Sequence, residues 1–267
     1  MDDQVLTHWP TTIGILGCGS STGVPLVGNQ WGLCDPKQPK NNRTRCAAMY
    51  VWANETWLID VTPDFRSQAL QANIQEVHGV LLTHAHYDHI GGLEDLKPLA
   101  RRYNRLIPVW MSAQTYDILR VRCPYAWHSS THVGYDAFLT PHIINGPFDT
   151  GNGLPIVPFE QDHGYSTTLG FRFPQWAYST DVVRLSNEAM SLLRHLDLWF
   201  VDAVSLTPRQ THSHLDQALG WIDQLGPRHS VLIHMGADMD YDTLCANLPH
   251  HVRPAYDGWR WHNGVIE

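Results

Sequence analysis

A short histidine-rich motif stands at the end of the apolar segment GVLLT. It reads HAHYDH over residues 84–89. Imidazoles and carboxylates are ligands that suit zinc, manganese and iron. In an extended turn, His84 and His86 lie on one side, while Asp88 and His89 begin the next helix and face a second point. The spacing predicts a metal site. A polar loop that arose by chance is the alternative, and the rarity of this spacing disfavours it.

Four residues at one turn cannot complete two coordination spheres, so we expect further ligands from other strand ends. His163 follows LPIVPFEQD, Asp181 follows WAYST and His234 follows VLI. Each residue alone is more often a surface or capping residue. As an ordered set after the histidine motif, the three are candidate metal ligands.

The elements that position these residues are predicted from apolar patterns and turn signals. We expect strands at Thr12–Gly17, Cys46–Ala53, Thr56–Val61, Gly79–Thr83, Pro108–Met111, Leu154–Glu160, Thr168–Phe173, Trp176–Ser179, Leu198–Asp202 and Ser230–His234. We expect helices at Asp64–Asn73, at Gly92–Tyr103 with a kink at Pro98, and at Asn187–Arg194, His214–Leu225 and Tyr241–Leu248. This order fits an α/β (α+β) protein with two sheets packed face to face and helices outside.

Composition limits the classes of protein. The 267 residues are 43% hydrophobic and show no repeat or linker, which favours one domain over residues 1–267. The net charge of −8 makes a nucleic-acid partner unexpected. The acidic start of the chain, residues 1–12, lacks an apolar signal segment, and no run is long enough to span a membrane. We expect a cytoplasmic protein without a membrane partner, and a homodimer is compatible with the sequence.

The whole set of residues resembles the metallo-β-lactamase superfamily, whose fold is a four-layer αββα sandwich with a dinuclear site. The matching motifs, in order, are Asp60, the cluster His84, His86, Asp88 and His89, and then His163, Asp181 and His234. The resemblance implies that His84, His86 and His163 bind one metal, that Asp88, His89 and His234 bind the other, and that Asp181 bridges them. It also implies that Asp60 supports the histidine loop from behind the ligands.

A narrower resemblance is to the branch that contains the PhnP-like cyclic phosphodiesterases. The shared stretches are GCGSSTGVP, HGYSTTLGFRF, THSHLDQAL and HMGADMDYDTL…PAYDG. In that branch a histidine before the SLDQAL-like helix is catalytic, which points to His212 here, with His214 as second choice. The candidate catalytic residues are therefore His212 and Asp88.

One departure from that branch concerns cysteine. Its members carry a cysteine cluster after the first loop and a second histidine late in the chain, which together hold a structural zinc. Here Cys34 is the nearest cysteine in the loop that precedes Cys46, and the late stretch reads His234-Met235-Gly236-Ala237. We therefore expect no structural zinc site, and the departure leaves the substrate's identity open.

The expected function is hydrolysis that depends on two divalent ions, Zn or Mn with Fe as a third option. The favoured substrate is a small phosphodiester, such as phosphoribosyl cyclic phosphate, attacked by a hydroxide held between the metals. A thioester or lactone hydrolase is the alternative, because one scaffold serves many chemistries. A nuclease for transfer-RNA 3′ ends is less favoured, since no basic arm is present. A di-iron oxidoreductase is disfavoured by His86, and a non-catalytic metal-binding module by the complete ligand set.

Overall fold

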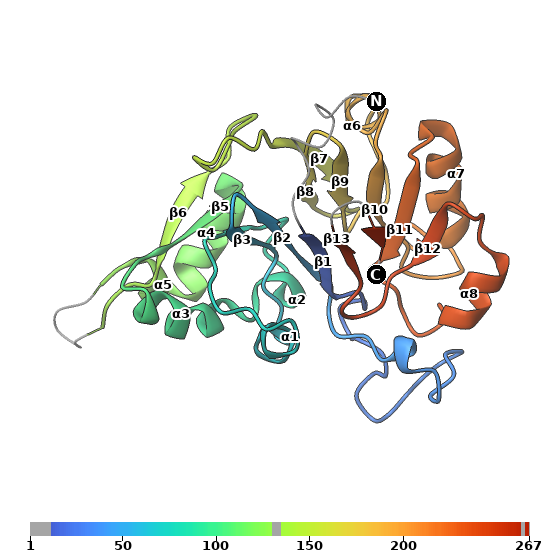
Figure 1. The fold of residues 1–267 in the computed structure, drawn as a ribbon, viewed down its shortest axis with the longest axis horizontal. Helices are drawn as coiled ribbons and strands as arrows, with labels where there is room; N and C mark the ends of the chain where they lie inside the picture. Colours follow the sequence, from blue (N-terminus) through green and yellow to red (C-terminus); the bar gives the residue numbers. More distant parts are fainter. Residues whose placement is uncertain (1–11, 130–134, 263–264, 267) are drawn as a thin grey trace.

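The computed structural model describes residues 12–129, 135–262 and 265–266, and its strands form two mixed sheets (Figure 1). In the first sheet the order is β14 (Val265–Ile266), β13 (Arg260–His262), β1 (Thr12–Gly17), β2 (Ala47–Trp52), β3 (Glu55–Ile59), β4 (Gly79–Leu81), β5 (Ile107–Met111) and β6 (Leu139–Ile143). In the second sheet the order is β12 (Val252–Pro254), β11 (His229–Ile233), β10 (Leu198–Asp202), β9 (Trp176–Ser179), β8 (Thr167–Arg172) and β7 (Val157–Asp162).

Helices flank both sheets, which confirms the expected α/β sandwich (Figure 1). On the side of the first sheet lie α1 (Phe65–Gln71), α2 (Tyr87–Ile90), α3 (Lys97–Arg102), α4 (Ala113–Arg122) and α5 (Pro124–Trp127). On the side of the second sheet lie α6 (Asn187–Leu192), α7 (Leu215–Leu225) and α8 (Tyr241–Asn247). Helix α7 buries Ala218, Ile222 and Leu225 on one face and stops at Gly226, whose left-handed φ of 63° ends the helix.

The core between the sheets is rich in aromatic side chains. Tyr50 of the first sheet meets Phe173 at a centroid distance of 5.2 Å, and Phe173 stacks on Trp176 at 3.8 Å. All three residues are buried. Aromatic pairs of this kind add about 0.5–1.5 kcal/mol each beyond the burial of their surface. These contacts fix the two sheets against each other.

Parallel strands bring the predicted ligands to one edge. Strands β3, β4 and β5 run parallel in the first sheet, and β9, β10, β11 and β12 run parallel in the second. Parallel strands place their carboxyl ends at the same edge of a sheet. The segments after β3, β4, β9, β10 and β11 therefore meet where the edges of the two sheets come together.

Some predicted elements were wrong in detail. The kinked helix expected over Gly92–Tyr103 is a 3₁₀ helix at Leu93–Leu96 followed by α3, with Pro98 in the first turn of α3, where its missing N–H costs nothing. Strand β7 begins and ends later than expected. Helices α4 and α5, the short 3₁₀ helix at Pro39–Asn41, and strands β6, β12, β13 and β14 were not predicted. Among the described residues, no helix is long and apolar enough to cross a membrane.

Candidate metal centre

The histidine loop leaves the first sheet just after β4. His86 is the N-cap residue of α2 and has an extended backbone, with φ −69° and ψ 149°. Asp88 and His89 lie inside α2, as the spacing predicts. The rings of His84 and His86 are 4.5 Å apart. The loop thus presents two imidazoles before the helix and two further ligand-type side chains within it.

Asp60, at the end of β3, holds this loop from below. Its carboxylate accepts hydrogen bonds from the backbone N–H and the hydroxyl of Thr83, both at 2.8 Å, and from Nδ1 of His89 at 2.7 Å. The Thr83 hydroxyl in turn accepts from Nδ1 of His84 at 3.0 Å. Because their Nδ1 atoms are used in this way, His84 and His89 present unprotonated Nε2 atoms to the centre of the site.

The structure brings the seven predicted ligands together as two groups that share Asp181. The first group is His84, His86, His163 and Asp181, and the second is Asp88, His89, Asp181 and His234. Within each group the ligand atoms lie within 4.8 Å of one another.

The two carboxylate oxygens of Asp181 face different groups. Its Oδ2 is 3.7 Å from Nε2 of both His84 and His163. Its Oδ1 is 3.1 Å from Nε2 of His89 and 3.5 Å from Nε2 of His234. A carboxylate in this position is suited to bridge two cations.

Unsatisfied polar atoms test whether these residues fit metal ions. The Nε2 atoms of His84, His89 and His234 are buried and have no hydrogen-bond partner. Leaving such a group unpaired costs about 1–3 kcal/mol. Three orphaned nitrogens that converge on one carboxylate are explained by divalent cations, because imidazole nitrogen and carboxylate oxygen are the donors such ions take. The residues therefore fit the metal site that the sequence predicts.

Backbone strain marks the same positions. Asp60, Asp181 and His234 have positive φ values of 64°, 53° and 59°, each just after a strand. Non-glycine residues rarely adopt this left-handed conformation, and when they do they cluster at functional sites. At these positions the side chains of Asp181 and His234 enter the ligand groups, and the side chain of Asp60 lies under the histidine loop.

Electrostatic interactions with neighbouring histidines keep the Asp181 carboxylate charged. Burial raises the pKa of Asp181, but His234, His89 and His84 together hold that pKa well below its usual range. Burial lowers the pKa of His84 well below its ordinary value. An ionised carboxylate and a neutral imidazole are the forms that bind a metal ion.

His212 lies beside the two groups and contacts Asp202 at the end of β10. Its Nδ1 donates to Oδ2 of Asp202 at 3.1 Å, and its Nε2 is 3.9 Å from Oδ2 of Asp181. Burial lowers the pKa of His212, but Asp202 raises it more, to about 9. Because Nδ1 is bonded to Asp202, Nε2 is the nitrogen of this imidazole that faces the centre.

His214, the second choice from the sequence, is placed differently. It is the N-cap residue of α7, and its side chain makes no capping hydrogen bond. It belongs to neither ligand group nor to the cluster of Asp202, His212 and His234. Of the two histidines, only His212 reaches the candidate centre.

The sequence reasoning missed Asp202. This residue ends the apolar stretch LWFVD and is fully buried. It accepts from the backbone N–H of Val182 at 3.1 Å, and its other oxygen is 3.6 Å from Nδ1 of His234. The same rule that singled out Asp181 and His234, a ligand-type side chain at a strand end, would have found it.

The loop around Cys34 is tied down by a buried arginine. Arg43 donates to the carbonyl of Met239 at 2.6 Å and to that of Gly236 at 3.3 Å, and it lies 3.8 Å from Sγ of Cys34. These bonds connect the early loop to the segment after His234. Hydrogen bonds therefore join the early loop to the segment after His234, the two regions that a structural zinc joins in the PhnP-like branch.

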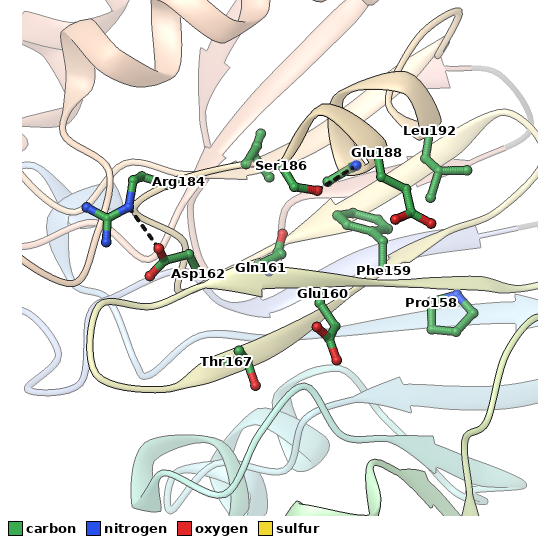
Figure 2. A pocket seen from close by; sticks show the side chains of 12 residues that line it. Pro158, Phe159, Glu160, Gln161, Asp162, Thr167, Arg184, Ser186, Glu188 and Leu192 are labelled. Atoms are coloured by element: carbon green, nitrogen blue, oxygen red, sulfur yellow. Dashed lines mark hydrogen bonds and ion pairs between the residues drawn. The ribbon is translucent and has the colours of Figure 1, made fainter.

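A hollow lies away from the ligand groups, between β7 and α6. It has a volume of about 790 Å³, and its walls include Phe159, Glu160, Leu185 and Glu188 (Figure 2). At one end, Asp162 and Arg184 form an ion pair at 2.8 Å. Asp162, at this end of the hollow, directly precedes His163 of the first ligand group.

Comparison with known proteins agrees with this geometry. The family described as "Beta-lactamase superfamily domain" matches residues 55–235. A solved structure described as a new diphosphatase from the PhnP family is 30% identical, over 94% of this chain and 96% of that one, with a TM-score of 0.87. The short form of human tRNase Z is 14% identical over 95% of this chain and 100% of that one, with a TM-score of 0.69, which shows the fold alone.

A curated relative from Porphyromonas gingivalis (strain ATCC BAA-308 / W83) is named Octanoyltransferase. It is 32% identical over 249 residues, which cover 91% of this chain and 50% of that protein. This chain therefore spans about half the length of that relative.

The chain belongs to the metallo-β-lactamase superfamily and, within it, to the PhnP-like branch. Its fold and its histidine–aspartate groups are those of a metal-dependent hydrolase.

Proposed function

We propose that this protein is a dinuclear metal-dependent phosphodiesterase that hydrolyses small phosphodiesters, including cyclic ones such as phosphoribosyl cyclic phosphate. One observation carries the proposal. The imidazole of His212 is held by Asp202 with its Nε2 toward Asp181, beside the two ligand groups. Such a group can deliver a proton to an oxygen that leaves phosphorus. The similarity to a PhnP-family diphosphatase supports chemistry at phosphorus.

In this proposal, two divalent ions, Zn or Mn with Fe as a third option, are held by the seven residues. His84, His86 and His163 hold one, Asp88, His89 and His234 the other, and Asp181 lies between. When bound, such ions supply Lewis-acid activation of water and of a phosphoryl oxygen. Asp60 fixes the orientation of the His84 and His89 rings through the hydrogen bonds described above.

In this proposal, His212 is the residue that donates a proton during the reaction. Hydrolysis forms a bond between a water oxygen and phosphorus, releases one proton of that water to solvent and breaks the ester bond. The leaving oxygen then takes the proton from Nε2 of His212, and the imidazole recovers a proton from solvent. Asp202 keeps Nδ1–H pointing away from the centre, so that Nε2 is the atom that faces the substrate. Asp88, which the sequence predicts to be catalytic together with His212, acts in this proposal through its contacts with His89 and His234.

A covalent route through cysteine is disfavoured by geometry. Cys46 is buried and contacts the hydroxyl of Tyr178 at 3.2 Å. Burial raises the pKa of this thiol to about 12. A thiol that stays protonated is a poor nucleophile. Acyl transfer through Cys46, the chemistry that a relative's name raises, therefore lacks an available nucleophile here.

The experiment is a comparison of substrates with the metal-free protein reloaded with Zn or Mn. The substrates are bis(4-nitrophenyl) phosphate, ribose 1,2-cyclic phosphate, an octanoyl thioester, a lactone and a precursor transfer RNA. We expect kcat/KM to be highest on one of the two phosphodiesters and to vanish without metal. Faster turnover of the thioester, the lactone or the RNA than of both phosphodiesters would contradict the proposal and select the corresponding alternative.

A further inference from the structure

The hollow between β7 and α6 has the size and the walls of a small-molecule site. Its volume of about 790 Å³ is within the range of ligand pockets in proteins. Apolar side chains line it, namely those of Pro158, Phe159, Leu185, Ala189 and Leu192 (Figure 2). None of the seven ligand residues of the candidate metal centre, all of them in the described part of the chain, lines it. The hollow is therefore a site apart from the one that carries the proposed hydrolysis.

A buried amide oxygen at the hollow has no hydrogen-bond partner. Gln161 lines the hollow and is 1% exposed, and its Oε1 has no donor among the described residues. Its Nε2 donates to the Thr168 hydroxyl at 3.1 Å and to the Thr180 carbonyl at 2.9 Å. Because a carbonyl can only accept, these bonds fix which end of the amide is the oxygen. In Figure 2 this side chain is directed from β7 toward Ser186, the N-cap residue of α6. A buried acceptor without a donor is unfavourable, so an N–H group brought into the hollow would stabilise it.

The lining of the hollow is negatively charged. Among the described residues that line it, Arg184 is the only cation, and it pairs with Asp162 at 2.8 Å. Within the same part of the chain, the exposed carboxylates of Glu160 and Glu188 form no ion pair. Glu188 lies in the first turn of α6, and its side chain extends toward Phe159 of β7 (Figure 2). In a molecule with a net charge of −8, these carboxylates make the hollow attractive to cations.

We propose that the hollow binds a small aliphatic amine in its ammonium form. The apolar walls take the aliphatic body, Glu188 attracts the charge, and Oε1 of Gln161 accepts one N–H. A primary ammonium offers three donors together with a positive charge. An alcohol lacks the charge, and a quaternary ammonium lacks the donors, so neither meets both requirements.

Three probes that share a hexyl chain test this proposal without any change to Gln161. Hexylammonium, hexyltrimethylammonium and hexan-1-ol are titrated into the metal-loaded protein at pH 7 in a calorimeter. Hexylammonium is protonated there, because an alkylammonium has a pKa near that of lysine, about 10.4. It should bind about 10-fold or more tightly than either other probe, since a charge-assisted hydrogen bond is formed only with it. Equal affinity of hexyltrimethylammonium would show that no N–H is recognised, and equal affinity of hexan-1-ol that no charge is; either result overturns the proposal.

An exposed carboxylate locates the binding site. Glu188→Gln should weaken the binding of hexylammonium about 3–5-fold and leave that of hexan-1-ol unchanged, as expected for a partly solvated charge. Asp216→Asn is the matched control, because Asp216 also lies in the first turn of a helix, α7, but does not line the hollow. It should change neither affinity. An unchanged affinity for hexylammonium in Glu188→Gln would place the binding elsewhere and refute the assignment.

A free amine and a lysine side chain of another protein share the same ammonium chemistry. A tripeptide with a central lysine, blocked at both ends, distinguishes these two sources. It should bind about 10-fold more weakly than hexylammonium, because its peptide groups lose water against the apolar walls. Tighter binding of the tripeptide would overturn the assignment to a small amine and indicate a protein partner in its place.

Discussion

His212 and Asp202 form a hydrogen-bonded pair in which one carboxylate orients an imidazole beside the candidate metal centre. Nδ1 of His212 lies 3.1 Å from Oδ2 of Asp202, while Oδ1 of Asp202 lies 3.6 Å from Nδ1 of His234. Asp202 is fully buried, so its charge is little screened by water. Asp202 therefore contacts both rings. The Nε2 atom of His212 lies outside the two ligand groups, and the Nε2 atom of His234 lies within the second one.

The first prediction concerns the proton that His212 carries. A general acid contributes about 10²–10⁴-fold in rate, so His212→Ala should lose about that much kcat on a phosphodiester with a poor alcohol leaving group. The loss should be much smaller with a 4-nitrophenolate leaving group, which needs little protonation. Steady-state kinetics on both substrates measures the difference, and metal content should stay at the wild-type level.

His214→Ala is the control for that experiment, because His214 lies at the start of α7 and outside the cluster. Its kcat should be close to that of the wild type. Equal losses on both leaving groups in His212→Ala would indicate stabilisation of charge in place of proton donation. An unchanged rate would exclude His212 from the chemistry.

The second prediction concerns Asp181, whose two oxygens face the two ligand groups. Elemental analysis of the purified wild type should approach two divalent metals per chain. Asp181→Ala should weaken both sites together, by about 10–100-fold or more in affinity, because a shared ligand is lost and the four imidazoles around it lose a nearby negative charge. Full occupancy and normal turnover in the variant would exclude a bridging role.

Much of the candidate centre could be predicted from the sequence because its ligands obey local rules. The spacing of His84, His86, Asp88 and His89 is set by one turn and the start of one helix. His163, Asp181 and His234 each follow an apolar strand, and parallel strands deliver their ends to one edge. The α/β sandwich followed from the same alternation of strands and helices.

What could not be predicted depends on contacts between distant segments. Asp202 contacts the candidate centre through His212, ten residues later and across a loop, and through His234 on the next strand. Helix α4 gave no clear signal because it buries only Thr115 and Leu119. Strand β6 contains Pro141 and polar residues, which a sheet tolerates at its edge but which hide a strand in the sequence.

The third prediction concerns the loop that carries Cys34. The Arg43 hydrogen bonds to Gly236 and Met239 already tie this loop to the segment after His234. Cys34→Ser should therefore leave the metal content of the protein unchanged, which elemental analysis checks. Arg43→Met should lower the free energy of unfolding by about 2–4 kcal/mol, because it leaves buried carbonyls without donors. Loss of one metal per chain in Cys34→Ser would show that a structural metal site exists after all.

The fourth prediction concerns the pH dependence of stability that comes from Asp257. Its carboxylate accepts from the backbone N–H of Thr44 at 2.7 Å, from the Thr44 hydroxyl at 2.6 Å and from the backbone N–H of Cys18 at 3.0 Å. Burial nevertheless raises the pKa of Asp257 from 3.8 to about 6. Between these values the folded state holds the proton more tightly than the unfolded state does. The resulting stabilisation is complete below about pH 4 and is lost as the pH rises through about 6.

Asp257→Asn removes this titration. The free energies of unfolding of wild type and variant are measured with urea at pH 4, 5, 6 and 7. Contributions from the metal ligands are the same in both proteins, so they cancel in the difference. Relative to the variant, the wild type should lose about 1–3 kcal/mol between pH 4 and pH 7 and nothing further above pH 7. Asp240→Asn is the contrast. Burial raises the pKa of Asp240, but hydrogen bonds from Thr243, Asp35 and Asn41 lower it to about 2, so its difference from the wild type should be constant from pH 5 to pH 7. A wild type that gains stability relative to Asp257→Asn as the pH rises would show that the hydrogen bonds from Thr44 and Cys18 outweigh burial.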